Sequence, residues 1–171
     1  MFFFNITSIT GMENLNTSQV TDMEGMFEFC DQLTSLEVSR FDTRKVLDFD
    51  IMFKDCQKIE SLDVSRFNTS EAIDMEGMFA NCLKIKSLDL WHFDTRKVER
   101  MSCLFYMCVA LKTIYCRDSW TCRSSEDMFK NCFSLRGAIA YDESKTNAKY
   151  ANPSTGYFTN YGAQNEAYKM S

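Results

Sequence analysis

Apolar positions recur along this chain with a period of 26 residues. The clearest marker is a phenylalanine followed three positions later by a cysteine, and its copies are Phe27/Cys30, Phe53/Cys56, Phe79/Cys82, Phe105/Cys108 and, after a shorter step of 24 residues, Phe129/Cys132. A fixed period of this length is typical of repeat proteins, in which no unit buries its own apolar side and each packs against the next. The pattern predicts a solenoid whose equal coils share one core.

Each repeat contains two different apolar spacings. Residues 36–38, 62–64 and 88–90 alternate apolar and acidic side chains, which is typical of a strand with one buried face. Within residues 26–33, apolar side chains stand at positions i, i+1, i+4 and i+7, which favours a helical turn. The predicted fold class is therefore α/β, with one short parallel strand and one helical turn in each 26-residue coil.

The repeats divide the chain into three parts. Residues 1–13 are expected to form a partial N-terminal coil, because Ile6-Thr7-Ser8-Ile9 is similar to Leu33-Thr34-Ser35-Leu36. Residues 14–136 carry the repeats. Residues 137–171 lack them, and are expected to cap the exposed end of the stack and to end in a loose tail.

The repeat resembles a known family. The pattern Leu-x-x-Leu-Asp-Val-Ser-x-Phe-Asp-Thr-x-x-Val-x-x-Met-x-x-Met-Phe-x-x-Cys, read over residues 33–56 and again over 59–82, is similar to the BspA-like leucine-rich repeats, of the DUF285 type, of bacterial surface proteins. The resemblance implies a curved, right-handed leucine-rich-repeat solenoid on a bacterial cell surface, used for adhesion or for binding host proteins. It offers no catalytic residues, because that family has no agreed set.

Composition and charge narrow the possible partners. The 171 residues are 45% hydrophobic and 25% charged, so we expect one elongated domain with a continuous core. The net charge is −5, and no Lys or Arg precedes Arg40, whereas six acidic residues do. Phosphate backbones would be repelled from that end, so nucleic acid is not an expected partner. The first residues lack a basic region and a long apolar run, so neither a signal peptide nor a membrane span is expected in this sequence.

Acidic side chains form a column at the predicted strand. Glu37, Asp63 and Asp89 would point outward one coil apart, where neighbouring like charges are destabilising. Either they form a binding patch for a cation or a basic ligand, or Arg40, Arg66 and solvent screen them. A metal site is not expected, because the ligands of calcium converge on one point whereas the side chains of a row diverge.

Two aromatic residues beside this column are candidate binding anchors. Trp91 stands where earlier repeats have Ser39 and Ser65, a position that strand alternation turns outward, and Tyr115 follows in the next repeat. Exposed Trp and Tyr supply large contact areas at low entropic cost. The alternative is that these rings pack under the C-terminal segment. The predicted ligand-binding residues are therefore Trp91, Tyr115, Glu37, Asp63 and Asp89.

Eight cysteines allow several interpretations. The five cysteines at the repeated position would form a buried column and pack as small hydrophobic groups. Zinc is disfavoured because the chain has no CxxC pair and only one histidine, His92. Cys116 and Cys122 lie in an irregular region, where a disulfide is possible in an oxidising environment. Two free thiols are the alternative.

The sequence therefore predicts a non-enzymatic interaction or adhesion module without a cofactor. We expect it to act as a monomer outside a bacterial cell, and to bind an extracellular or host protein, or a glycan, on its repeat face. The alternatives are a solenoid carbohydrate-active enzyme and a passive spacer. Recurrence of the acidic residues in every repeat argues against the enzyme, since a unique active site would cluster them once.

Overall fold

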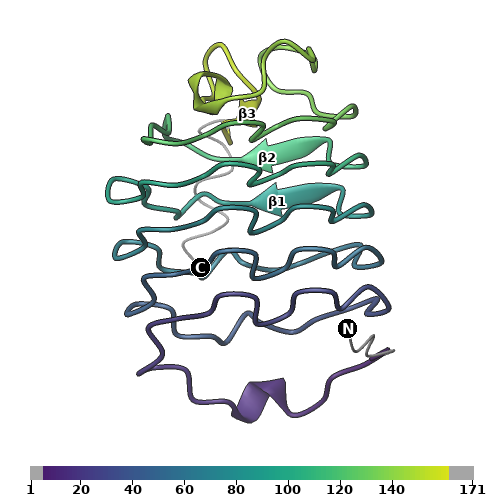
Figure 1. Ribbon diagram of the computed structural model, residues 1–171, viewed down its shortest axis with the longest axis vertical. Coiled ribbons are helices and arrows are strands. Elements are labelled where there is room, and N and C mark those ends of the chain that lie inside the picture. The colour runs from purple at the N-terminus through teal and green to yellow at the C-terminus, as the bar shows by residue number, and fades with distance from the viewer. Residues whose placement is uncertain (1–5, 162–171) are drawn as a thin grey trace.

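The computed structural model describes residues 6–161 of the chain, and most of them lie in turns and irregular coil. Three short strands form an open parallel sheet in the order β1-β2-β3 (Figure 1). The regular elements are the 3-10 helix η1 (Met12–Asn14), β1 (Ser87–Asp89), β2 (Thr113–Tyr115), the 3-10 helix η2 (Ala148–Tyr150) and β3 (Phe158–Thr159).

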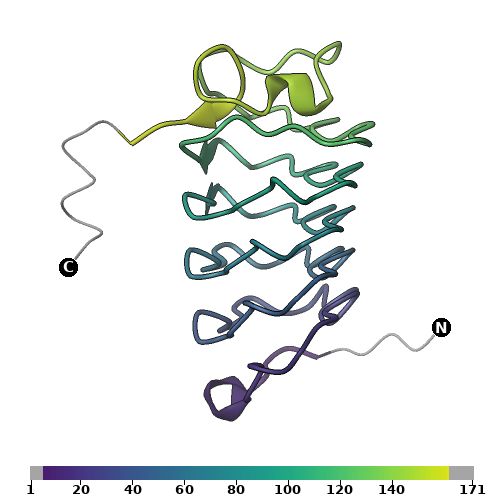
Figure 2. The same ribbon diagram turned by 90° about the vertical axis from the view of Figure 1, so that its left-hand side faces the viewer.

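Successive repeats lie one above another, and we call each of them a winding (Figures 1 and 2). Backbone N–H groups of one winding donate to carbonyl oxygens of the next. Phe27 donates to Met52 and Phe53 donates to Met78, both at 2.9 Å. Isolated parallel bridges join equivalent positions from bottom to top, at Asp22, Asp48, Asp74, Arg100 and Ser124. The period of the sequence is therefore the length of one winding.

Phenylalanine rings form the centre of the core. Neighbouring rings in the column are 5.5–5.8 Å apart between centroids and are tilted by 12° or less. The column consists of Phe27, Phe53, Phe79, Phe105 and Phe129. Each fully buried side chain of this size contributes about 1.5–3 kcal/mol to folding, so the repeated apolar positions are the main source of stability.

Buried threonine side chains bond each winding to the backbone of the next one. The Thr69 hydroxyl donates to the Asp94 carbonyl oxygen at 3.0 Å and accepts from the Asp94 N–H at 2.8 Å. Thr43 makes the same pair of bonds to Asn68, at 2.9 and 2.8 Å. One buried side chain thus satisfies both polar groups of a peptide segment in the next winding.

The predicted helical turn over residues 26–33 is wrong, and residues 6–161 contain no α-helix. In its place, each winding makes consecutive tight turns, in which residues with positive φ stand among residues with negative φ. Gly25 and Phe29 have φ of 58° and 60°, and Gly77 and Asn81 both have φ of 60°. A right-handed helix requires negative φ at every residue, so these left-handed residues end it after one turn. The freed N–H groups bond to the next winding.

The predicted strands are present in only part of the stack. Strand β1 covers most of predicted strand 88–90 and pairs in parallel with β2, whereas residues 36–38 and 62–64 are not strands. Their alternation of buried and exposed residues is nevertheless as predicted. The charge of Asp63 acts on Glu37 in the adjacent winding, and such repulsion opposes close pairing. The ladder forms where Asp89 faces Tyr115, which is uncharged.

Residues after the last repeat cover the upper end of the stack (Figure 1). The Phe129 N–H donates to the Thr146 carbonyl oxygen at 2.9 Å, and the Tyr157 ring packs edge-on against the Phe129 ring at 5.1 Å. Residues 1–5 of the expected partial coil and residues 162–171 of the expected tail lie outside the described residues.

Candidate recognition surface

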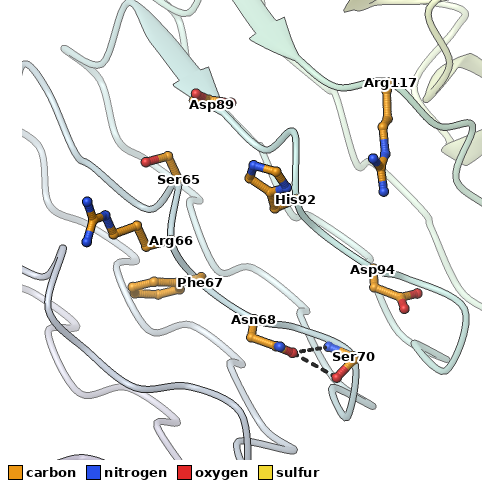
Figure 3. A pocket seen from close by; sticks show the side chains of 9 residues that line it. All are labelled: Ser65, Arg66, Phe67, Asn68, Ser70, Asp89, His92, Asp94 and Arg117. Atoms are coloured by element: carbon orange, nitrogen blue, oxygen red, sulfur yellow. Dashed lines mark hydrogen bonds between the residues drawn. The ribbon is translucent and has the colours of Figure 1, made fainter. Parts of the chain in front are cut away.

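A surface hollow lies at the turn that follows β1 and at the equivalent turns of neighbouring windings. It has a volume of about 690 Å³ and crosses three windings (Figure 3). Its lining residues are Ser65, Arg66, Phe67, Asn68, Ser70, Asp89, His92, Asp94 and Arg117. Polar side chains dominate this lining, so the hollow suits a hydrated, charged ligand better than an apolar one.

Two further hollows extend it in both directions along the stack. One of about 540 Å³ shares His92, Asp94 and Arg117 with the first, and one of about 500 Å³ shares Arg66 and Asn68 with it. The three hollows share lining residues and follow one another across four windings, from the segment around residue 40 to the segment around residue 118, and we call them together the trough. It is long enough to hold an extended segment of a partner.

Most acidic groups of the trough have a basic partner beside them. Asp42 pairs with Arg44 at 2.6 Å, and the hydrogen bond from that guanidinium lowers the pKa of Asp42 to about 2. Asp94 is paired in the same way with Arg96 at 2.5 Å, which also lowers the pKa of Asp94. These two carboxylates are therefore ionised, and each is already paired with a neighbouring arginine.

Three cationic or titratable side chains of the trough have no such partner. The side chains of Arg40, Arg66 and His92 make no hydrogen bond or ion pair with any other of residues 6–161, although the charge of Arg40 lowers the pKa of Glu37. All three are exposed, and they stand at the same position of consecutive repeats. Arg117 adds a fourth group from the next winding, although it also contacts Asp118 at 3.1 Å. The trough therefore offers a surplus of hydrogen-bond donors for anions.

The predicted acidic column is used to hold turns. Glu37 accepts the Ser39 N–H at 2.9 Å, and Asp63 accepts the N–H and hydroxyl of Ser65 at 3.1 and 2.7 Å. The bonds from Ser39 also lower the pKa of Glu37. Of the three acidic residues, only Asp89 lines the trough, and it accepts the Trp91 N–H at 3.2 Å. A turn-forming role explains why an acidic residue recurs two positions before each corner.

Trp91 does not face solvent as strand alternation predicted. Only 8% of it is exposed, and its ring centroid is 5.0 Å from that of Tyr161. The Tyr115 ring stacks on the same Tyr161 ring at 4.3 Å and 8°. Since β1 ends at Asp89, the alternation no longer applies two residues later. The alternative prediction, packing beneath the C-terminal segment, describes what the structure shows. The structure thus brings two predicted binding residues together.

The eight cysteines are free thiols in the structure. Cys116 and Cys122 are not joined. The Cys116 sulfur donates to the Asp118 carbonyl oxygen at 3.5 Å and the Cys122 sulfur donates to the Ser124 carbonyl oxygen at 3.2 Å. These two sulfurs therefore have separate hydrogen-bond partners.

Among residues 6–161, no three His, Cys, Asp or Glu side chains are grouped so that they could hold a metal ion. The same residues include no helix with the length and apolar character needed to cross a membrane.

The trough residues Arg66, His92 and Arg117 were not among the predicted ligand-binding residues. The signal was present in part, because Arg40, Arg66 and His92 stand exactly one period apart. Screening of the acidic column by Arg40 and Arg66 is one of the two interpretations that the sequence allows, and the charge of Arg40 does lower the pKa of Glu37. The turn bonds made by the acidic side chains become visible only in three dimensions.

Comparison with known proteins gives the class of the chain. The family model described as "Mycoplasma protein of unknown function, DUF285" matches residues 1–120, 37–145 and 92–167. The chain therefore belongs to the DUF285 family, which confirms that part of the resemblance. No curated protein and no solved structure matches the chain.

Proposed function

We propose that this protein is a non-enzymatic recognition module of the BspA-like leucine-rich-repeat type, displayed outside a bacterial cell. Its windings would form a right-handed solenoid, and the trough would bind an extracellular or host protein. The observation that carries the proposal is the row of Arg40, Arg66 and His92 along the trough, whose side chains make no hydrogen bond or ion pair with another of residues 6–161.

The charge of the trough favours an acidic partner segment. The chain as a whole has a net charge of −5, so the surface outside the trough would repel an acidic protein. An acidic partner is therefore directed to the trough. Guanidinium groups bind carboxylates through two parallel hydrogen bonds, which adds direction to the attraction. An extended acidic segment lying along the stack would meet Arg40, Arg66, His92 and Arg117 in four successive windings. Such complementarity raises the association rate and selects the partner.

The carboxylates of the trough favour binding over catalysis. A glycoside hydrolase requires a carboxylic acid and a carboxylate positioned around one bond. Here Asp42 and Asp94 are ionised and held by neighbouring arginines, and Asp89 accepts a turn N–H. The arginines lower the pKa of both Asp42 and Asp94, so neither of these two carboxyl groups holds a proton for transfer at neutral pH.

A binding array of extracellular proteins and glycans tests the proposal. The double variant Arg66→Ala/His92→Ala should weaken retention of a bound protein by about tenfold or more. The matched control is Arg123→Ala, because Arg123 is also exposed and its side chain makes no contact with the trough. Absence of any specific retention would favour a spacer. Retention of glycans alone, or turnover of a polysaccharide, would contradict protein binding.

A further inference from the structure

The ring of Tyr161 occupies a cradle made by two other aromatic residues. It stacks on Tyr115 with centroids 4.3 Å apart and lies 5.0 Å from Trp91 at an angle of 56°. Tyr115 ends β2, whereas Trp91 follows β1 in the preceding winding. Tyr161 arrives from β3, which pairs in parallel with β2 through Ile114–Phe158 and Tyr115–Thr159. One segment of the chain thus places a single ring between two windings.

The cradle adjoins the trough. Asp89, which lines the trough, lies opposite Tyr115 in the pairing of β1 with β2 and accepts the Trp91 N–H at 3.2 Å. Figure 3 shows Asp89 and Arg117 on either side of His92, on neighbouring windings. A ligand that filled the trough at these windings would therefore lie next to the aromatic cradle.

We infer that Trp91 and Tyr115 form a binding site for an aromatic side chain of the partner protein, and that the ring of Tyr161 fills this site when no partner is bound. The inference rests on the proposed function. The chemical class of the ligand follows from the present occupant, which is a tyrosine ring in nearly parallel stacking. Aromatic pairs prefer such offset stacking, and Tyr and Trp dominate the energetics of protein interfaces. The partner segment would carry an aromatic residue next to acidic ones.

Tyr161 competes with such a ligand as part of the same molecule. A tethered group has a high effective concentration at its site, so a partner ring must displace it. The apparent affinity of the partner is reduced by the fraction of chains whose cradle is open. Removing the Tyr161 ring should therefore tighten binding, which is the opposite of what loss of an ordinary contact would do.

Tryptophan fluorescence and a peptide probe test this inference on the full chain. In Tyr161→Ala, emission from Trp91 should shift to longer wavelength because water reaches its ring. A peptide with one tyrosine between aspartates should bind this variant about tenfold more tightly than it binds the native chain. The same peptide with alanine in place of tyrosine should show no such gain. Asn160→Ala, a change at the exposed neighbouring residue, is the matched control and should behave like the native chain.

Two further variants keep the test decisive. Tyr161→Phe retains the ring and should restore native emission and native peptide affinity. Trp91→Leu added to Tyr161→Ala should abolish the gain in affinity. Unchanged emission in Tyr161→Ala, or equal affinity of the tyrosine peptide for both chains, would overturn the inference. A protein partner that depends on Arg66 but is indifferent to Tyr161→Ala would overturn the cradle alone and leave the proposed function standing.

Discussion

The Cys82 thiol donates a hydrogen bond to the carbonyl oxygen of Phe53, 3.3 Å away in the preceding winding. The same relationship recurs along the column, between Cys56 and Phe27, Cys108 and Phe79, and Cys132 and Phe105, with distances of 2.9–3.3 Å. The repeated cysteine therefore does more than fill space. It gives a second hydrogen bond to a carbonyl oxygen that already accepts a backbone N–H within its own winding, and it links each winding to the one before it.

Replacing Cys82 by alanine should lower the free energy of unfolding by about 0.5–1.5 kcal/mol through the lost hydrogen bond, because the Phe53 carbonyl oxygen then keeps only its bond from the Cys56 N–H at 3.2 Å. Chemical denaturation measures this change. Cys103→Ala is the control, since Cys103 is partly exposed and its sulfur makes no hydrogen bond to another described residue. Equal losses for the two variants would show that the bond to Phe53 contributes nothing.

Thiol reactivity should divide the cysteines into two groups. Burial raises the pKa of Cys82 and of Cys132 to about 12, whereas Cys30, Cys103 and Cys122 are only partly buried. The thiolate is the reactive form, so the partly buried cysteines should be alkylated first in the folded protein. Mass spectrometry after timed alkylation gives the order.

The same experiment reports on Cys116 and Cys122. Alkylation after unfolding without reductant should modify all eight cysteines, because the structure has eight free thiols. Six modified cysteines would restore the disulfide hypothesis. Rapid labelling of Cys82 in the folded chain would contradict its burial.

The positions of the core side chains were predicted better than the backbone conformation of the turns. Column positions such as Phe79 follow from periodicity alone, because a side chain that recurs once per winding must meet its neighbours. The hand of the turns does not follow from apolar spacing, since consecutive turns and a helix both bring residues i and i+4 to one side. Gly25, Gly77 and Asn81 were the available signal, because glycine and asparagine tolerate positive φ.

The arrangement of the candidate surface follows only in part from the sequence. The sequence placed Trp91 and Tyr115 in one functional group, and the structure brings both rings to Tyr161. It did not predict the trough, because a hollow depends on how neighbouring corners lie relative to one another. The sequence also does not show that the Asp63 carboxylate accepts hydrogen bonds from the N–H and hydroxyl of Ser65. Asp63 makes these bonds within its own turn and forms no ion pair with Arg66.

Stability should depend on the ionisation of Asp50. One oxygen of this carboxyl group is buried without a hydrogen-bond partner among residues 6–161, and Asp74, Glu76 and Asp48 lie near it. Burial, with a smaller effect of these charges, raises the pKa of Asp50 from 3.8 to about 6. The folded chain then holds this proton more tightly than the unfolded chain. Ionised Asp50 therefore destabilises the fold above about pH 6, and this destabilisation is relieved as the pH falls from 6 toward 4.

Asp50→Asn removes the charge and should raise the melting temperature at pH 7.5, with a much smaller effect at pH 4. Thermal unfolding followed by circular dichroism over this pH range measures the difference. Glu99→Gln, at an exposed position on the side of the stack, controls for the change in net charge. If asparagine stabilised the chain equally at both pH values, the benefit would come from packing and not from ionisation.

The segment after residue 141 should be required to close the upper end of the core. Tyr157 is fully buried, packs edge-on against Phe129, and exchanges hydrogen bonds between its hydroxyl and the Asp142 backbone at 3.1 and 3.2 Å. Tyr157→Ala should cost about 3–5 kcal/mol through the cavity it leaves, and Tyr157→Phe about 0.5–1.5 kcal/mol through loss of the hydroxyl bonds.

Deleting all residues after Tyr141 removes this cover altogether and should expose the Phe129 ring, so the shortened chain should associate in light-scattering measurements. The Tyr157 variants distinguish the two contributions of the cap even if the deletion prevents folding, because Tyr157→Phe keeps the ring against Phe129 while removing only the polar contact. A monodisperse shortened chain with an unchanged melting temperature would show that the last winding is stable without its cap.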